Sequence, residues 1–308
     1  MISSELWRAA SDGKPLFVRR FLPEGPARAV VHLCHGMAEH GARYARLAEA
    51  LTAAGYAVYA NDHRGHGRTA GTPDQLGFFD GGLERVTRDL VELVAFEKQE
   101  HPGLPFALLG HSMGSFFAQQ LMQTHGDQFQ AVVLSGTAGK PNLLAAAGRT
   151  IARLERMRLG PRGKSRLIRA LAFDAFNKPF HPKPTRFEWL SRDRAEVDLY
   201  AADPLCGFDC AIELWVGVLD LLRDLALPER QARIPKTLPV YVFCGAEDPA
   251  GERTRSVRQL LGALGAAGLT DVTHRFYEGG RHEMLNEVNR AEVVRDLLGW
   301  LEPRLKGR

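Results

Sequence analysis

A serine between two glycines, in the run Gly110-His-Ser112-Met-Gly114, is the first residue of this sequence that could do chemistry. It follows a short apolar run at 106–109 and precedes a segment with helical spacing that runs from Met113 to about Thr124. In such a strand–turn–helix setting, G-x-S-x-G is the pattern of a nucleophile elbow, which holds the serine hydroxyl above a sheet. The alternative is an ordinary turn that happens to contain serine, and the setting favours Ser112 as a nucleophile.

A serine hydroxyl attacks efficiently only when a neighbouring base removes its proton. His282 is the expected base, because its loop directly follows a predicted strand at 272–277 and can reach the same sheet edge as Ser112. His274 is its nearest rival, but it falls inside the strand pattern and is expected to be a surface or packing residue. Five further histidines stand on strand-end loops, and several of them are expected to lie near the cleft: His35, His40, His63, His66 and His111.

The expected partner of the base is Asp248, which lies just beyond another predicted strand, 238–244. It completes the chain order Ser…Asp…His that accompanies a nucleophile elbow. Its carboxylate would accept a hydrogen bond from the imidazole Nδ1 and stabilise the imidazolium without taking the proton. Glu247 is the alternative, although a solvated loop carboxylate is the simpler interpretation of that residue.

Cleavage of an acyl group also needs two N–H donors where the negative oxygen of the tetrahedral intermediate forms. One is expected from Met113, the residue after the serine. The other is expected from the loop that follows the apolar run at 29–34, where Gly36 allows the backbone to turn towards the site. We therefore predict that the backbone amides of Met37 and Met113 form the oxyanion hole.

The elements that must position these residues alternate between short apolar runs and longer helical patterns. This order predicts a mostly parallel sheet with helices on both faces, an α/β fold. From about 137 to 233 no convincing strand appears, and the alternation then returns at 238. We therefore expect a core of residues 1–136 and 236–308 with an inserted helical cap at 137–235. The predicted strands are 29–34, 56–60, 106–109, 131–135, 238–244 and 272–277, and the predicted helices are 47–54, 83–100, 113–124 and 291–301.

The composition of the 308 residues is that of a globular protein, with 45% hydrophobic and 25% charged residues. The net charge of +4 comes without a basic stripe interleaved with aromatic residues, so nucleic acid is not an expected partner. The basic residues are concentrated at 149–194, where thirteen Lys and Arg stand against four Asp and Glu. Attraction to an anionic lipid surface is the functional hypothesis for this region, and a solvated helix face is the alternative.

The four cysteines, Cys34, Cys206, Cys210 and Cys244, are expected to be reduced thiols. Cys34 and Cys244 stand in apolar runs, and the C-x-x-x-C pair Cys206 and Cys210 has no second ligand pair, so no zinc site is expected. The N-terminal residues do not have the pattern of a signal peptide, and no apolar run is long enough to span a membrane. These features favour a cytoplasmic protein.

Seven segments together resemble the monoacylglycerol lipase and lysophospholipase branch of the α/β-hydrolases, a serine aminopeptidase S33-like family. The resemblance extends from about residue 28 to residue 290, and the ordered set of motifs is far more specific for the branch than for a substrate. One departure is Ser115, where many relatives carry a second glycine. The segments are His35-Gly-Met-Ala-Glu-His-Gly-Ala-Arg-Tyr44, Asn61-Asp-His-Arg-Gly-His-Gly67, Leu109-Gly-His-Ser-Met-Gly114, Ser191-Arg-Asp193, Asp203-Pro204, Gly245-Ala-Glu-Asp-Pro249 and Gly280-Arg-His-Glu283.

The resemblance implies an α/β-hydrolase fold with a helical cap, the same Ser–Asp–His triad, and no cofactor or metal. It further implies hydrolysis of single-chain lipid esters, such as monoacylglycerol or lysophospholipid. A short-chain carboxylesterase, a peptidase or amidase of the same fold, and a non-catalytic ligand-binding protein are the alternatives. Most aromatic residues of the insertion are expected to form its own core, and a few are expected to line an acyl pocket.

Overall fold

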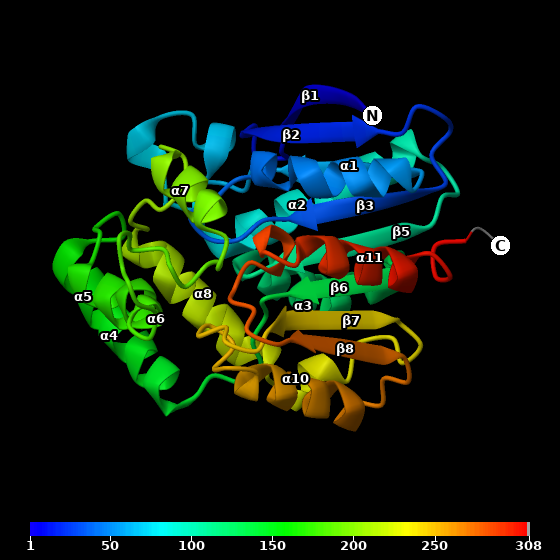
Figure 1. The fold of residues 1–308 in the computed structure, drawn as a ribbon. Helices are drawn as coiled ribbons and strands as arrows, with labels where there is room; N and C mark the ends of the chain where they lie inside the picture. The colour runs from blue at the N-terminus through cyan, green and yellow to red at the C-terminus, as the bar shows by residue number, and fades with distance from the viewer. Residues whose placement is uncertain (307–308) are drawn as a thin grey trace.

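The computed structural model describes residues 1–306, apart from the side chain of Leu144, and its centre is an eight-stranded sheet (Figure 1). The strand order is β1-β2-β4-β3-β5-β6-β7-β8, and the six strands from β3 onward pair with one another only in parallel. This confirms the predicted α/β-hydrolase sheet. The strands are β1 (Ile2–Ala9), β2 (Pro15–Leu22), β3 (Ala29–Cys34), β4 (Tyr56–Asn61), β5 (Phe106–His111), β6 (Ala131–Ser135), β7 (Val240–Gly245) and β8 (Val272–Tyr277).

The first two strands form an antiparallel hairpin that the apolar pattern of the sequence did not predict. β1 is an edge strand, and six of its eight residues are exposed, so it carries no apolar alternation. β2 pairs antiparallel with β4 and extends the parallel sheet by two strands. The mostly parallel description of the sheet therefore holds, with an antiparallel edge.

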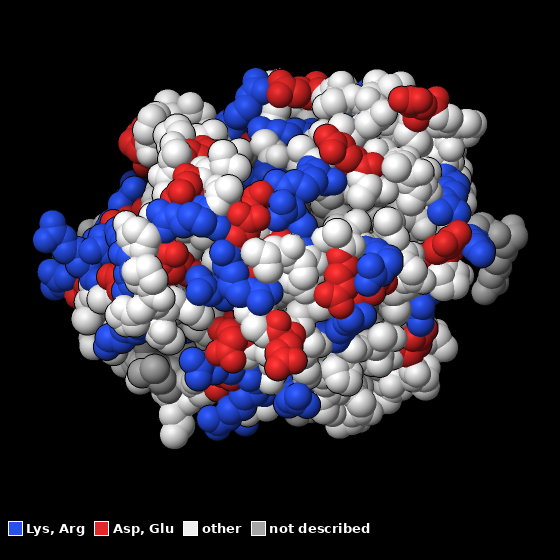
Figure 2. Space-filling model, in the orientation of Figure 1, with Lys and Arg blue, Asp and Glu red and all other residues white. Residues whose placement is uncertain are grey.

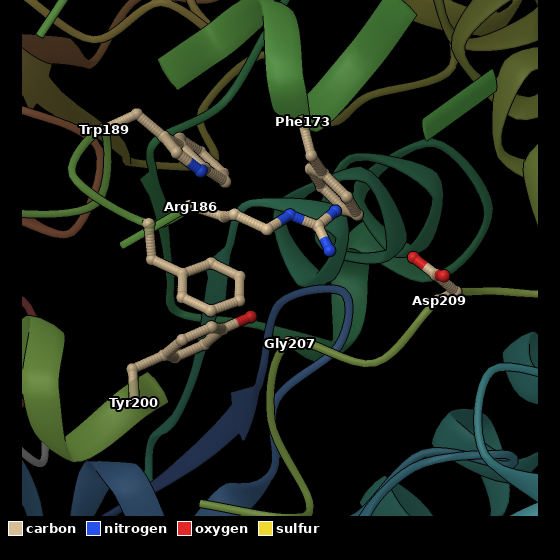
Figure 3. A pocket seen from close by; sticks show the side chains of 7 residues that line it. Phe173, Arg186, Trp189, Tyr200, Gly207 and Asp209 are labelled. Carbon is tan, nitrogen blue, oxygen red and sulfur yellow. The ribbon is translucent and has the colours of Figure 1, made fainter. Parts of the chain in front are cut away.

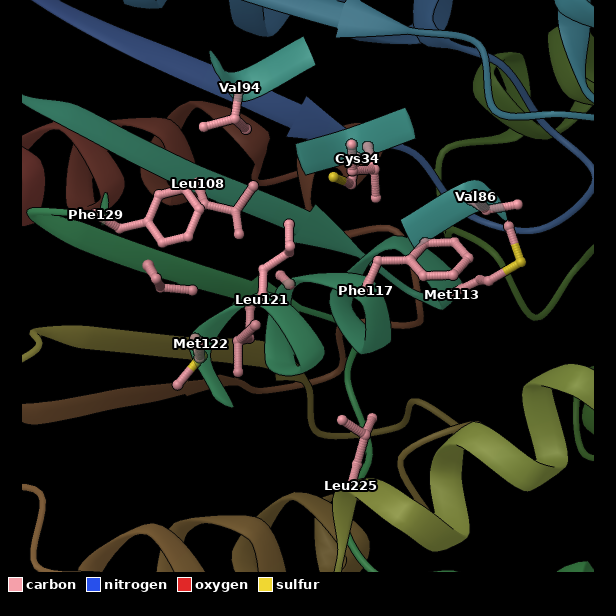
Figure 4. Close-up of a cluster of buried hydrophobic side chains, with 14 of the residues drawn as sticks. Cys34, Val86, Val94, Leu108, Met113, Phe117, Leu121, Met122, Phe129 and Leu225 are labelled. Atoms are coloured by element: carbon pink, nitrogen blue, oxygen red, sulfur yellow. The ribbon is translucent and has the colours of Figure 1, made fainter. Parts of the chain in front are cut away.

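Helices cover both faces of the sheet, as expected for parallel strands joined by crossovers (Figure 1). Side chains at alternate strand positions enter two separate apolar clusters, so that Leu108 faces one and Leu109 the other. Figure 4 shows the first cluster, which contains Phe117 and Leu121 of α3. The first face is covered by α2 (Gly82–Glu100), α3 (Met113–His125) and α10 (Arg255–Ala266), and the second by α1 (Ala45–Ala53) and α11 (Arg290–Leu301).

Between β6 and β7 the described chain contains helices and no strand, in agreement with the expected insertion (Figure 1). Two apolar clusters belong to this segment, one around Trp189 and Tyr200 and one around Ala152 and Ile168. α8 differs from the other insertion helices because Val218 and its apolar neighbours on this helix belong to the first apolar cluster of the sheet. The division at 137 and 235 stays a prediction. The helices are α4 (Leu143–Leu159), α5 (Arg166–Arg169), α6 (Ala175–Asn177), α7 (Arg194–Ala202), α8 (Ile212–Leu225) and α9 (Pro228–Gln231).

No helix within residues 1–306 combines the length and the apolar character that a bilayer-spanning segment requires.

A fully buried ion pair joins the sheet to α2. Nδ1 of His32, on β3, lies 2.8 and 3.0 Å from the two carboxylate oxygens of Glu97. Burial by itself lowers the pKa of His32, but the neighbouring Glu97 carboxylate raises it, and the net pKa is about 10. The imidazolium form of His32 is therefore stabilised by a carboxylate that has no access to water.

We predict that Glu97→Gln lowers the free energy of unfolding by about 3–5 kcal/mol, because it breaks a buried ion pair and forces the His32 imidazolium to give up its proton. The matched control is Glu100→Gln, less than one turn further along α2, which breaks only an exposed contact with Arg20 and should cost about 1 kcal/mol or less. Urea unfolding at neutral pH measures both. Equal losses in the two variants would contradict the prediction.

Candidate active site

The turn between β5 and α3 holds Ser112 with φ 51° and ψ −123°, a backbone conformation that is rare for residues other than glycine. The glycines on either side are required by close packing. A Cβ at Gly110 would lie 2.4 Å from the carbonyl oxygen of Gly114, and a Cβ at Gly114 would lie 2.1 Å from that of Cys34. The turn therefore has the strained geometry expected of a nucleophile elbow.

The two amides predicted to bind an oxyanion are both unpaired: neither Met37 N–H nor Met113 N–H has an acceptor within residues 1–306. Met113 is the first residue of α3, where helical N–H groups have no acceptor in the helix. The loop after β3 approaches the serine closely, because a Cβ at Gly36 would lie 3.2 Å from the Cβ of Ser112. Two free donors, one at the start of α3 and one on the loop after β3, thus stand next to the serine, where a developing negative charge would be stabilised.

The expected base and acid are in direct contact. Nδ1 of His282 lies 3.0 Å from both carboxylate oxygens of Asp248, and these residues are 1% and 0% exposed. Oδ1 of Asp248 also accepts the backbone N–H of Ala250 at 2.9 Å. Burial lowers the pKa of His282, but Asp248 raises it by charge and by hydrogen bonding, and the net pKa lies above the ordinary value of 6.5. This pairing fixes the imidazole so that Nε2 is the nitrogen left for a substrate or serine.

No hydrogen bond joins Ser112 to His282 among the described contacts of these two residues. The two loops are nevertheless neighbours: Ser112 N–H donates to the carbonyl of Ser135 at 2.9 Å, and a Cβ at the next residue, Gly136, would lie 3.0 Å from Cε1 of His282. Such hydrogen bonds are often long before substrate binds, so this geometry is compatible with the predicted pairing.

The remaining histidines do not compete for the role of base. His274 is exposed on β8, in agreement with the sequence prediction. His35, His63 and His66 are buried together, with ring centroids 4.1 and 5.3 Å from His35. Burial lowers the pKa of all three, so they remain neutral. They pack together in the loops that follow β3 and β4.

His111 is a different kind of neighbour, since its ring centroid lies 4.9 Å from that of His282. Burial, together with the charge of His282, lowers the pKa of His111 to about 4. Its Nδ1 lies 3.1 Å from the hydroxyl oxygen of Ser135. His111 is therefore a neutral side chain that packs against the expected base.

The insertion covers His282 through a segment that sequence reasoning did not single out for this role. The ring of Trp189 lies 4.7 Å from that of His282, and its carbonyl accepts the His282 N–H at 3.3 Å. Nη1 of Arg281 donates to the carbonyls of Glu188 and Ser191 at 2.5 and 3.0 Å. The Ser191-Arg-Asp193 motif was the one available signal for this contact.

An aromatic pocket opens beside Trp189 (Figure 3). Phe173, Phe187 and Tyr200 supply its apolar walls, and Gly207 leaves the space that the Phe187 ring occupies. Figure 3 shows the guanidinium of Arg186 and the carboxylate of Asp209 at the same pocket. The pocket encloses only about 10 Å³, close to the space of one water molecule, so a ligand could enter only if these side chains moved apart.

One group of potential metal ligands occurs among residues 1–306, namely His40, Asp203 and Cys206, whose ligand atoms lie within 4.8 Å of one another. Nε2 of His40 and Oδ2 of Asp203 already share a hydrogen bond of 2.9 Å. The guanidinium charge of Arg43 acts on Cys206 and opposes a second cation there. The group is therefore better described as a contact between the β3 loop and the insertion, and Cys210 is not part of it.

Comparison with known proteins identifies the family. The family model described as serine aminopeptidase, S33, matches residues 25–289. The chain belongs to this Hydrolase_4 family. Its sequence is 31% identical to the monoacylglycerol lipase of Mycolicibacterium smegmatis over 294 residues, which cover 92% of this chain and 91% of that protein. It is 29% identical to the monoglyceride lipase of Homo sapiens over 298 residues, covering 96% and 89%.

A solved structure, a highly thermostable carboxyl esterase from Bacillus coagulans in complex with glycerol, is also similar to this hydrolase. Its TM-score is 0.91 at 25% identity, and the similarity covers 99% of both chains. These findings confirm the resemblance inferred from the motifs. The chain is a carboxylic ester hydrolase with the α/β-hydrolase fold.

We predict that kcat/KM of this hydrolase falls as the pH decreases through the pKa of His282, because only the neutral imidazole can accept a proton. Since that pKa is raised above 6.5, the midpoint of the acid limb should also lie above pH 6.5. A pH–rate profile with a soluble ester measures it. A midpoint well below pH 6.5 would contradict the assignment of His282 as the base.

Asp248→Asn should reduce kcat by about 10⁴, the loss typical of this change in a serine triad. It should also move the acid limb to lower pH, since the carboxylate that raises the pKa of His282 is removed. His274→Gln is the control, because it changes an exposed histidine and should leave the rate unaltered. A fully active Asp248→Asn variant would exclude Asp248 as the orienting acid.

Proposed function

We propose that this hydrolase cleaves single-chain lipid esters, such as monoacylglycerol or lysophospholipid, through an acyl-enzyme on Ser112. The observation that carries the proposal is the strained serine turn next to two free backbone amides and a buried His282–Asp248 pair. The printed names of two similar proteins, monoacylglycerol lipase and monoglyceride lipase, support the class of substrate.

In the first half of the reaction, Nε2 of His282 takes the proton of the Ser112 hydroxyl as Oγ forms a bond to the ester carbonyl carbon. The carbonyl π electrons move to oxygen, and the Met37 and Met113 amides donate to that oxyanion. The tetrahedral intermediate then collapses and breaks the bond to the alcohol oxygen, which receives the proton from His282. The products of this half are the free alcohol and the acyl ester of Ser112.

In the second half, water replaces the alcohol. His282 takes a proton from water as its oxygen attacks the acyl carbon, the same amides bind the oxyanion, and collapse returns the proton to Ser112. The fatty acid leaves. Asp248 keeps its negative charge throughout and stabilises the imidazolium in both halves.

The aromatic side chains that adjoin His282 support a substrate with an apolar chain. Phe173 and Trp189 stack with ring centroids 6.0 Å apart, and Trp189 also contacts the ring of His282. A chain bound along these rings would therefore lead to the proposed reacting centre. Arg186 and Asp209 also line the aromatic pocket, and they pair there with Asp174 and Arg169.

The direct test is steady-state hydrolysis of esters with increasing acyl length, including monoacylglycerol and lysophosphatidylcholine, by wild type and Ser112→Ala. We expect the highest kcat/KM with long acyl chains and loss of activity in the variant. A maximum at two to four carbons would replace the lipid substrate with a short-chain ester. Turnover of peptide amides alone, or of no substrate, would reject the proposal.

We also propose that α4 and α5 contact an anionic membrane surface. At 100° per residue, five exposed positions of α4 fall within an arc of about 80°, so they form one stripe along the helix. Three of them carry large apolar side chains, and Leu143, Leu154 and Met157 are 91%, 55% and 75% exposed. Leu167 and Leu171, one turn apart, are exposed on the neighbouring segment. The five positions of the stripe are Leu143, Ala147, Thr150, Leu154 and Met157.

Unpaired positive charge on the same insertion favours an anionic partner. Arginines of α4 are paired with carboxylates, for example Arg156 with Glu213. By contrast, four exposed basic residues at 164–183 form no ion pair within residues 1–306: Lys164, Arg166, Lys178 and Lys183. Figure 2 shows Lys and Arg gathered at the end of the molecule where α5 lies. Each such charge near an anionic bilayer contributes about 1 kcal/mol.

We predict that the protein sediments with phosphatidylglycerol vesicles more than with phosphatidylcholine vesicles, and that high salt weakens this binding. The double change Leu154→Asp and Met157→Asp should reduce binding at least about tenfold, because burial of each side chain contributes about 1.5–3 kcal/mol. Leu199→Asp is the control, since Leu199 is exposed on α7 away from the stripe. Vesicle binding that changes neither at high salt nor in the double variant would contradict the proposed surface.

A further inference from the structure

Arg43 makes three short contacts with two buried carboxylates from distant parts of the chain. Its Nη1 lies 2.6 Å from Oε2 of Glu39 and 2.6 Å from Oε1 of Glu283, and its Nη2 lies 2.7 Å from Oε2 of Glu283. Glu39 and Glu283 are 3% and 4% exposed. Arg43 itself is covered by the ring of Tyr200 at 4.7 Å. The three charged groups therefore form one desolvated cluster.

On one side, the cluster holds the loop that carries Met37. Oε1 of Glu39 accepts the Gly36 N–H at 2.5 Å and the Tyr44 hydroxyl at 2.7 Å. The Gly36 carbonyl lies 2.7 Å from Nδ1 of His35, which donates to it. Both polar groups of Gly36 are thus fixed, and because the peptide that follows is planar and trans, the direction of the Met37 N–H is fixed as well.

On the other side, the cluster holds the loop of His282. Glu283 is the next residue along the chain, and its N–H donates to the Leu190 carbonyl at 2.7 Å. Oε2 of Glu283 accepts a hydrogen bond from Asn286 at 3.0 Å in addition to the contact with Arg43. The His282 backbone therefore cannot shift without disturbing the ion pair with Arg43.

We propose that Arg43 is a positioning residue that holds the Met37 amide and the His282 imidazole in register with each other, through Glu39 and Glu283. This inference rests on the proposed function, because it assigns the two loops to one reaction. If Arg43 did not hold Glu39 and Glu283, the Met37 N–H and the His282 imidazole could move independently of each other. Small errors in the position of such groups reduce the reaction rate strongly.

The cluster also sets the charge around His282. The groups that face the imidazole are the carboxylates of Asp248, Glu283 and Glu39, which raise its pKa, and the neutral His111. Burial would raise the pKa of Glu283, but Arg43 holds it at about 2, so Glu283 is ionised at all working pH values. While both carboxylates stay ionised, removal of the guanidinium raises the pKa of His282 further, because no cation then opposes their charge.

The test compares Arg43→Gln with a matched control, Arg46→Gln. Arg46 lies one turn later, at the start of α1, and its ion pair with Glu196 is exposed at the arginine. With a soluble ester, Arg43→Gln should lower kcat by about 10²–10³, the loss expected when an oxyanion donor is misplaced. KM should change little, and the acid limb of kcat/KM should move to higher pH. Arg46→Gln should match wild type in all three.

Glu283→Gln distinguishes an effect on positioning from an effect on folding. It keeps Arg43 and its ion pair with Glu39, and removes only the ion pair with Glu283. It should lower kcat and move the acid limb to lower pH, since a carboxylate that raises the pKa of His282 is lost. Adding Glu283→Gln to Arg43→Gln should bring the acid limb back towards wild type without restoring kcat. Circular dichroism and thermal melting report whether each variant is folded.

Folded Arg43→Gln with the kcat and acid limb of wild type would overturn the inference. If Arg43→Gln does not fold, an unaltered kcat and pH profile in Glu283→Gln would overturn it in the same way. Arg43→Lys, which keeps the charge but cannot hold two carboxylates with a planar fork, should recover the acid limb and only part of kcat. A wild type that hydrolyses no ester would instead reject the proposed function and, with it, the inference.

Discussion

The contact between Gly114 and β3 is the constraint on which the site depends. Because a Cβ at this position would lie 2.1 Å from the Cys34 carbonyl oxygen, α3 can begin directly at the sheet edge only with glycine here. The chain must then pass from β5 into α3 in a single residue, and Ser112 takes up the strained backbone that this requires. Strain of this kind costs about 1–3 kcal/mol and persists only in rigid surroundings. The buried face of α3, which includes Phe117 and Leu121, provides these rigid surroundings.

The other site residues reach the serine because parallel strands end at one edge of a sheet. Loops after β3, β7 and β8 bring Met37, Asp248 and His282 to the end of β5 without any of them being close in sequence. Close packing keeps these loops in register: a Cβ at Gly245 would lie 2.1 Å from the Gly280 carbonyl oxygen. His282 is held from two sides, by Asp248 within the core and by Trp189 of the insertion. The insertion thus covers the proposed base, His282, and also helps to position it.

The sequence predicted the parallel strands and the residues on the loops that follow them, since these signals are local. Continuous apolar runs mark the buried strands, and the glycines around Ser112 mark the turn. β1 escaped prediction because an exposed edge strand has no apolar alternation. The contact between Arg43 and Glu283 was not predicted from the sequence for another reason. The two residues are 240 positions apart, and a charged residue in a sequence is normally solvated, so only the folded chain shows that Glu283 is buried and pairs with a largely covered Arg43.

In the proposed mechanism, ester cleavage passes through a covalent acyl group on Ser112. The most direct measurement is the mass of the protein quenched in acid within its first turnovers of a long-chain p-nitrophenyl ester, followed by peptide mapping. The account predicts a mass increase equal to one acyl group, located on the peptide that contains Ser112 and absent from Ser112→Ala. Turnover without any adduct, or an adduct on another residue, would contradict it.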